Sequence, residues 1–133
     1  MSINLTQHAA TAEQTAAGVV DLGERDLARL QKLLTFGSPP DEQEIRARAD
    51  AIAEIAALSS PFPRRAMIGG ALWLMSPLAV SLWRLGIEPV FAFSVRETEE
   101  QKQLDGSIKK IAIFRHAGFI PAVYPDAGRQ PAL

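Results

Sequence analysis

Three polar segments each follow a short apolar run that is typical of a buried strand. They are Thr6–His8, Gly69–Gly70 and Ser94–Glu97. In an open parallel sheet, ligands bind beyond the carboxyl ends of the strands, so we expect these segments to lie around one mouth. Together they supply hydroxyls, an imidazole, a carboxylate, a guanidinium and glycines whose backbone a ligand can approach closely. This set favours a phosphate-bearing or nucleotide-like ligand, with Arg96 as the phosphate-binding fork.

An apolar segment, Ala71–Met75, separates the glycine pair from Ser76 and Pro77. Ser76 and Pro77 predict the start of a helix, with Ser76 as the N-cap and the positive end of the helix dipole near the ligand. The five apolar residues are therefore expected in a loop, where they either line a pocket, with Trp73 stacked on a base, or form a homodimer contact or pack into the core. The candidate ligand-binding residues are Thr6, Gln7, His8, Gly69, Gly70, Trp73, Ser76, Ser94, Arg96 and Glu97.

Each of these features also has a purely structural interpretation. The glycine pair fits a tight turn, His8 fits a turn cap and Ser76 fits a helix cap. Arg96 beside Glu97 fits a weak surface ion pair. The glycines lack the G-x-G-x-x-G spacing and the Lys-Ser/Thr of a P-loop, which argues against a GTPase or an ATPase. Two histidines and no cysteine argue against a zinc site, and no cofactor is predicted.

Composition limits the function further. The chain has 133 residues, of which 47% are hydrophobic and 22% charged, as is typical of one globular domain. Its net charge of −1 gives no general attraction to nucleic acid, so bulk DNA binding is not expected. Met1–Ala10 lacks the pattern of a signal peptide, and no apolar run is long enough to span a membrane. We therefore expect a cytoplasmic protein without a membrane partner.

The remaining patterns alternate between helix and strand. Thr11 and Gln14 form a capping-box pattern, and the helix that starts there is expected to end near Gly18. Asp21 and Ser38 are the predicted N-caps of two further helices. Strands are expected at 2–6, 18–20, 66–68 and 87–93, and an Asp-Gly hairpin at 97–114.

This order of elements predicts a Rossmann-like α/β domain with three layers. The sheet is expected to be mainly parallel, because strand, helix and strand follow one another with short connections. A C-terminal antiparallel hairpin is expected to extend it. The single domain is placed at 1–120, and the chain is expected to become irregular after His116, with a tail at 121–133 that is rich in proline.

Four stretches carry a resemblance to a known group of proteins: Asn4–Val19, Met67–Ala71, Gly86–Glu97 and Phe114–Phe119. In these stretches the chain resembles a family of small uncharacterised bacterial and phage proteins with a Rossmann-like fold. That family is in turn similar to the CRISPR-associated CARF and ring-nuclease proteins, which bind or cleave cyclic oligonucleotide signals. The resemblance implies a nucleotide-signal ligand and a role in phage defence or anti-defence. Where the family has a Glu after Pro-Leu, this chain has Ala79, so no role is carried over there.

Two functions of different classes follow. The first is binding of a nucleotide or cyclic-oligonucleotide-like signal at the strand ends. In a hydrolytic version, His8 or His116 would orient water or protonate a leaving oxygen, and Arg96 would neutralise phosphoryl charge. The second is a protein–protein interaction module, an inhibitor or adaptor that uses the apolar 71–75 segment without a small ligand. Whether the protein is an enzyme is left open, and a homodimer is expected.

Overall fold

The computed structural model describes residues 1–123, so the predicted tail from Tyr124 to the C-terminus lies outside the described residues. Helices and strands alternate through most of this range. None of the helices in it is long and apolar enough to cross a membrane. The elements are β1 (Ser2–Leu5), α1 (Ala12–Ala16), β2 (Val19–Val20), α2 (Glu24–Leu34), α3 (Glu42–Ala57), β3 (Arg65–Ile68), α4 (Leu72–Arg84), β4 (Glu88–Lys102) and β5 (Ile108–Pro121).

The described strands form one mixed sheet in the order β2-β1-β3-β4-β5, curled as a half-barrel. β2, β1, β3 and β4 are parallel, and β5 is antiparallel to β4. An α/β domain with a mainly parallel sheet and a C-terminal antiparallel hairpin is therefore confirmed. The chain adds β2 on one side of β1, then crosses back and adds β3 and β4 on the other side. The direction in which strands are added thus reverses between β1 and β3.

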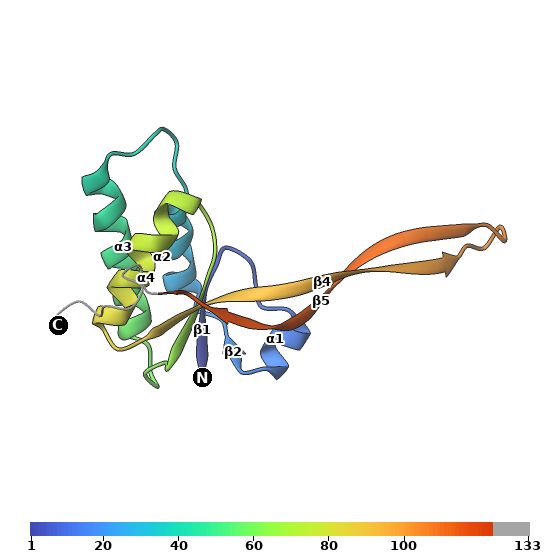
Figure 1. The fold of residues 1–133 in the computed structure, drawn as a ribbon, viewed down its shortest axis with the longest axis horizontal. Coiled ribbons are helices and arrows are strands. Elements are labelled where there is room, and N and C mark those ends of the chain that lie inside the picture. Colours follow the sequence, from blue (N-terminus) through green and yellow to red (C-terminus); the bar gives the residue numbers. More distant parts are fainter. Residues whose placement is uncertain (124–133) are drawn as a thin grey trace.

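Most of the core lies between the sheet and one layer of helices. α2, α3 and α4 cover the same face (Figure 1) and pack against strand residues such as Leu5 and Ile68. The opposite face holds a smaller cluster around Met67, which Ala10 and Phe119 also contact. Because side chains alternate between the two faces of a strand, the neighbours Met67 and Ile68 belong to different layers. The short helix α1 lies on this less covered face.

The first helix begins as its sequence predicts. Thr11 Oγ1 accepts a hydrogen bond from the backbone N–H of Gln14, and Gln14 Oε1 accepts one from the backbone N–H of Thr11. These reciprocal bonds are the capping box. α1 is followed by the brief strand β2, which pairs with β1 in parallel. The short β-α-β start of the chain is therefore fixed by local signals.

The predicted N-caps of α2 and α3 are wrong. Gly23 takes the place expected for Asp21. The carboxylate of Asp21 instead accepts hydrogen bonds from the side chain of Asn4 and the backbone N–H of Ala10. Asp41 takes the place expected for Ser38 and accepts a hydrogen bond of 2.8 Å from the backbone N–H of Glu44. A carboxylate at this position satisfies a free N–H and also faces the positive end of the helix dipole, which favours it over a hydroxyl three residues earlier.

α4 begins five residues before the predicted start, with Ala71 rather than Ser76 at the N-cap position. The expected loop over 71–75 and the expected cap at Ser76 are both wrong, because the helix starts at Leu72 and holds Ser76 and Pro77 in its second turn. Leu74 and Leu78 lie four residues apart and are completely buried. Burial of Leu74 offsets the backbone hydrogen bond that Pro77 cannot donate.

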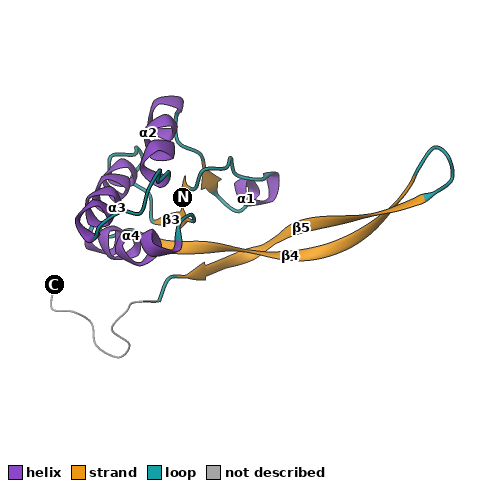
Figure 2. Cartoon of the chain, turned by 90° about the horizontal axis from the view of Figure 1, so that it is seen from above, coloured by secondary structure: helices purple, strands orange, loops and turns teal. Residues whose placement is uncertain are grey.

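β4 and β5 continue far beyond the rest of the sheet. β3 pairs with β4 only up to Val90, whereas β4 and β5 pair from Val90 to Lys102 with a register shift between Phe93 and Ser94. The two-stranded extension projects from the body in both views (Figures 1 and 2); we call residues 93–119 the arm. Since β5 runs to Pro121, the prediction of irregular chain directly after His116 is wrong. Backbone pairing with β4 orders these residues.

Candidate functional site

A cavity of about 680 Å³ lies at the carboxyl ends of β1 and β3, where the direction of strand addition reverses. In open α/β sheets this reversal opens a crevice between the loops, and ligands bind there. The start of α1 and the first part of β4 complete its wall. The lining residues are Thr6, Gln7, His8, Ala9, Thr11, Gln14, Met67, Ile68, Gly69, Gly70, Ala71, Phe91 and Ala92.

A buried asparagine fixes the first loop of this cavity. Asn4 is only 3% exposed. Its Nδ2 group donates to the backbone carbonyl of His8 and to Asp21 Oδ1, both at 2.8 Å. Its Oδ1 accepts from the backbone N–H and the hydroxyl of Thr6, at 2.9 and 2.7 Å. Asp21 Oδ1 also accepts from the backbone N–H of Ala10. Asn4 therefore holds the loop from Thr6 to Ala10 against Asp21, directly after the end of β2.

The glycine pair gives the cavity its second wall. A Cβ on Gly69 would come within 3.4 Å of Thr6 Cγ2, so a larger residue there would crowd the neighbouring loop. Gly70 has a φ of +140°, a backbone conformation that favours glycine. A Cβ on Gly70 would also meet Leu34 and Met75 at ordinary contact distance. The pair thus lets the chain turn sharply from β3 into α4 and leaves its backbone open to the cavity.

The N-terminus of α4 lies at the rim of the cavity. Ala71 occupies the N-cap position and lines the cavity, and no side chain among the described residues caps the helix. The first backbone N–H groups of a helix lack intrahelical partners and carry a partial positive charge. These groups are available to an anionic part of a ligand.

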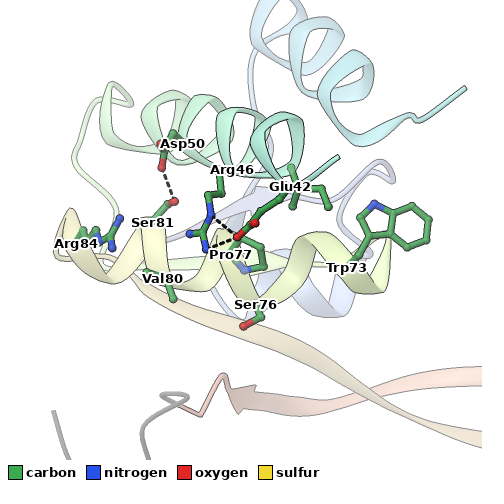
Figure 3. Close-up of a pocket in the computed structure, with 10 residues that line it drawn as sticks. Glu42, Arg46, Asp50, Trp73, Ser76, Pro77, Val80, Ser81 and Arg84 are labelled. Carbon is green, nitrogen blue, oxygen red and sulfur yellow. Dashed lines mark hydrogen bonds and ion pairs between the residues drawn. The ribbon is translucent and has the colours of Figure 1, made fainter. Parts of the chain in front are cut away.

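Two predicted site residues lie elsewhere on α4. Trp73 and Ser76 line a separate cavity of about 410 Å³ between α3 and α4 (Figure 3). Trp73 stands at the first turn of α4 and packs edge-on against Phe36, with ring centroids 5.5 Å apart. Within the same cavity, Ser81 donates a 2.6 Å hydrogen bond to Asp50 and so joins the two helices. The structure therefore does not bring Trp73 and Ser76 together with the strand-end residues.

The three predicted residues of β4 lie on the arm. Ser94, Arg96 and Glu97 are exposed and do not line the strand-end cavity. Glu97 accepts a hydrogen bond of 2.8 Å from Arg115 on β5, and this contact raises the pKa of Arg115. β4 does not end at Ser94, so its carboxyl end is far along the arm rather than at the mouth. Phe91 and Ala92 take the predicted place of Ser94 at the cavity.

His116 lies at the base of the arm rather than in the cavity wall. It is the cross-strand partner of Ser94 and packs against Phe119, with ring centroids 4.8 Å apart. Its Nδ1 atom is buried and has no hydrogen-bond partner among the described residues. His8 is therefore the ionisable side chain that lines the cavity itself.

The cavity is lined by both polar and apolar side chains, and His8 is the ionisable one among them. Among the described residues that form it, none is Asp, Glu, Lys or Arg. No group of three or more metal-ligating side chains was found in residues 1–123.

Sequence reasoning missed Thr11 and Gln14, whose capping-box pattern placed them at a helix start but not beside Gly69. The start of α1 and the Gly69–Gly70 turn come together because β1 and β3 are neighbours in the sheet, and sheet order cannot be predicted from local patterns.

The fold and the cavity define an α/β protein with a mixed sheet and a pocket of polar and apolar residues at the point where strand order reverses. Comparison of the chain with family models matches the Uncharacterized protein MJ1673 family over residues 1–120. The chain belongs to this family, and the match covers the body and the arm. No curated protein and no solved structure matches the chain.

Proposed function

We propose that the protein binds a nucleotide or cyclic-oligonucleotide-like signal in the strand-end cavity. The observation that carries the proposal is the place of the cavity: it joins the reversal of strand order, a glycine pair and the start of α4. Its volume of about 680 Å³ lies within the roughly 300–1,000 Å³ of small-molecule sites. In this proposal the fold is a reduced Rossmann-like one, with α1 as the remnant of the second helical layer.

The lining suggests how such a ligand is held. A phosphate would accept hydrogen bonds from the open N–H groups at Gly70–Leu72, where the helix dipole favours negative charge. The polar loop around Gln7 and His8 would contact the sugar or a second phosphate. Met67 and Phe91 supply an apolar surface for a base.

A ligand larger than one nucleotide would continue along β4. Ala92 lines the cavity, and alternate residues of a strand share a face, so Ser94 and Arg96 lie on the same side two and four residues further on. Arg96 is exposed and would bind a second phosphate there. Arg96 therefore belongs to the proposal only for an oligonucleotide.

Hydrolysis is an extension of the same proposal. Water would attack a phosphorus atom, the bond to the leaving ester oxygen would break, and protonated His8 would donate its proton to that oxygen. The proton lost by the water would pass to solvent. The phage-defence or anti-defence setting that the resemblance implies belongs to this proposal as well.

A thermal-shift experiment tests the binding. The protein is melted with mono-, di- and cyclic nucleotides and with cyclic oligonucleotides. A ligand at 100 times its Kd adds about 2.7 kcal/mol of stability, which raises the melting temperature by several degrees. His8→Ala and Gln7→Ala should reduce this response, whereas Gln43→Ala, at an exposed glutamine on α3, should leave it unchanged. No response to any nucleotide class would contradict the proposal.

A second function, recognition of a partner protein, is favoured by the exposed start of α4. Leu72 is 87% exposed and Trp73 is 52% exposed, whereas Leu74 and Met75 of the same segment are buried. A cavity formed with Pro39 and Pro40 adjoins Trp73. Trp73→Ala discriminates between the two functions. Loss of a protein complex with an intact nucleotide response would favour the interaction module, and the reverse would favour the nucleotide site.

A further inference from the structure

The arm is a two-stranded ribbon without a third layer. Every residue of β4 from Ala92 to Lys102 is exposed, and β3 pairs with β4 only up to Val90. The pairing of β4 with β5 has no further register shift between Ser94 and Lys102. Side chains alternate between the two faces of a strand, and cross-strand partners share a face. The charge of each face of the arm can therefore be counted separately.

One face of the arm, which we call the basic face, carries a net positive charge. It consists of alternate residues of β4 and their cross-strand partners on β5: Arg96, Thr98, Glu100 and Lys102, with Phe114, Ala112, Lys110 and Ile108. Three of these side chains are cations and one is an acid, so the net charge of this face is +2. The opposite face holds Glu97 and Glu99 against Lys109 and Arg115, and these charges cancel. The positive charge of the arm is therefore confined to one face.

The cations of the basic face are available to an anion. Within residues 1–123, neither Arg96 nor Lys102 nor Lys110 forms an ion pair within 4 Å. Glu100 is the register partner of Lys110 but is not at ion-pair distance from it. On the opposite face, by contrast, Arg115 pairs with Glu97 at 2.8 Å. An anionic partner of the basic face does not have to displace an ion pair.

An exposed aromatic ring shares the face with these cations. Phe114 is 67% exposed and is the cross-strand partner of Arg96. Unpaired nucleobases stack on exposed rings of this kind, and a neighbouring guanidinium binds phosphate. The apolar residues of β5 on the opposite face are Ile111 and Ile113, which are half-buried and offer no ring. An acidic peptide would use the cations alone, whereas a single-stranded nucleic acid uses both the cations and the ring.

We propose that the basic face of the arm binds single-stranded nucleic acid, with phosphates on its three cations and a base stacked on Phe114. Arg96 and Lys102 stand about 20 Å apart along β4, at about 3.3 Å per residue. Lys110 lies between them, opposite Glu100. The cations thus form a row along the length of the arm, and a nucleic-acid backbone can follow this row.

The basic face leads to the strand-end cavity. Ala92 lines that cavity, and Ser94 follows it on the same face of β4, before Arg96. A strand bound along the arm can therefore extend into the cavity with one end. This last step rests on the proposed function, whereas binding along the arm does not.

Fluorescence anisotropy of a labelled oligothymidylate tests the proposal with the full chain. We expect a dissociation constant in the micromolar range at low salt. Three neutralised phosphates give a slope of about −2 for log affinity against log salt concentration, so a fourfold rise in salt should weaken binding about 16-fold. An oligothymidylate annealed to its complement should compete less well, because its paired bases cannot stack on Phe114.

Two neighbouring lysines provide a matched pair of variants. Lys110→Gln removes a cation from the basic face and should weaken binding about three- to tenfold at low salt. Lys109→Gln removes the same charge from the opposite face and should leave binding unchanged. Phe114→Leu keeps an apolar side chain but removes the ring, and should weaken binding at least about fivefold. Circular dichroism confirms that each variant is folded.

Three results would overturn the proposal: a native chain that does not bind the oligothymidylate at low salt, equal effects of the two lysine substitutions, or a folded Phe114→Leu variant with native affinity. Polyglutamate or phosphatidylserine vesicles that displace the strand as well as unlabelled oligothymidylate would assign the face to an acidic protein or a membrane instead. His8→Ala should leave most of the strand affinity in place. A nucleotide response in the melting experiment without strand binding would reject the arm as the site and leave the cavity proposal standing.

Discussion

At the scale of single residues, the candidate site depends on one buried side chain that does not line it. Asn4 uses both amide hydrogens and accepts two further hydrogen bonds, all within the β1–α1 loop and with Asp21. A buried polar group is favourable only when its bonds are complete. The position of Thr6 and His8 at the cavity is therefore linked to the side chain of Asn4.

Asn4→Ala should lower the free energy of unfolding by about 2–4 kcal/mol, because it leaves several buried partners without their hydrogen bonds. Urea denaturation measures this change. Gln43→Ala, an exposed amide on α3, should change stability by less than about 0.5 kcal/mol. Equal effects of the two substitutions would show that the Asn4 network does not stabilise the fold.

Gly70→Ala should destabilise the protein by about 1–3 kcal/mol, because alanine is strained at the φ of +140° found there. Gly37→Ala is the matched change at a glycine without this conformation and with open space around it. It should leave stability unchanged or raise it by up to about 1 kcal/mol. Thermal melting of both variants decides whether the turn into α4 needs glycine.

At the scale of elements, helix starts depend on which apolar residues a helix can bury. Thr11 caps α1 because its hydroxyl and the Gln14 amide close a local ring of bonds. Ser76 carries an equally good capping signal, yet it lies inside α4 because the preceding turn buries Leu74 and Met75. A local signal prevails only where packing does not favour a longer helix.

Alanine substitutions at Thr11 and Ser76 distinguish a residue that caps a helix from one that lies inside a helix. Thr11→Ala should cost about 1 kcal/mol, because it removes a working N-cap. Ser76→Ala should be neutral or slightly stabilising, because alanine is the better residue inside a helix. Chemical denaturation measures both. A loss of about 1 kcal/mol in the Ser76 variant would contradict the position of the helix start.

At the scale of the whole molecule, the body and the arm are distinct. The core clusters include Phe91 and Phe119 but no described residue between them. The arm is joined to the body through the two paired strands and a few contacts between α1 and β5. The stability of the body should therefore be nearly independent of the arm.

Replacing residues 95–115 by Asn-Gly tests this independence. Ser94 and His116 are cross-strand partners, so a two-residue turn can join them. We expect the shortened chain to fold cooperatively and to keep its free energy of unfolding within about 1 kcal/mol, because no core residue is removed. Calorimetry and circular dichroism provide the measurement. Loss of the cooperative transition would show that the arm is part of the folding unit.

Much of the fold could be predicted from the sequence because its signals are local. The capping box at Thr11, the apolar run at Ala66–Ile68 and the Asp-Gly turn each involve a few neighbouring residues. The N-cap at Asp41 was misplaced by only three residues, since several polar residues compete at that end. Helix and strand order, and with it the α/β class, followed from these signals.

The tertiary structure alone decided which segments meet. The sequence determined that polar loops and a glycine pair follow apolar strands, because turn chemistry and strand periodicity are properties of adjacent residues. It could not determine that β4 continues into an arm, which carries Ser94 and Arg96 away from Thr6 and Gly69. Strand length is set by pairing with β5, a contact between distant parts of the chain, and sheet order then placed Gln14 beside the glycines.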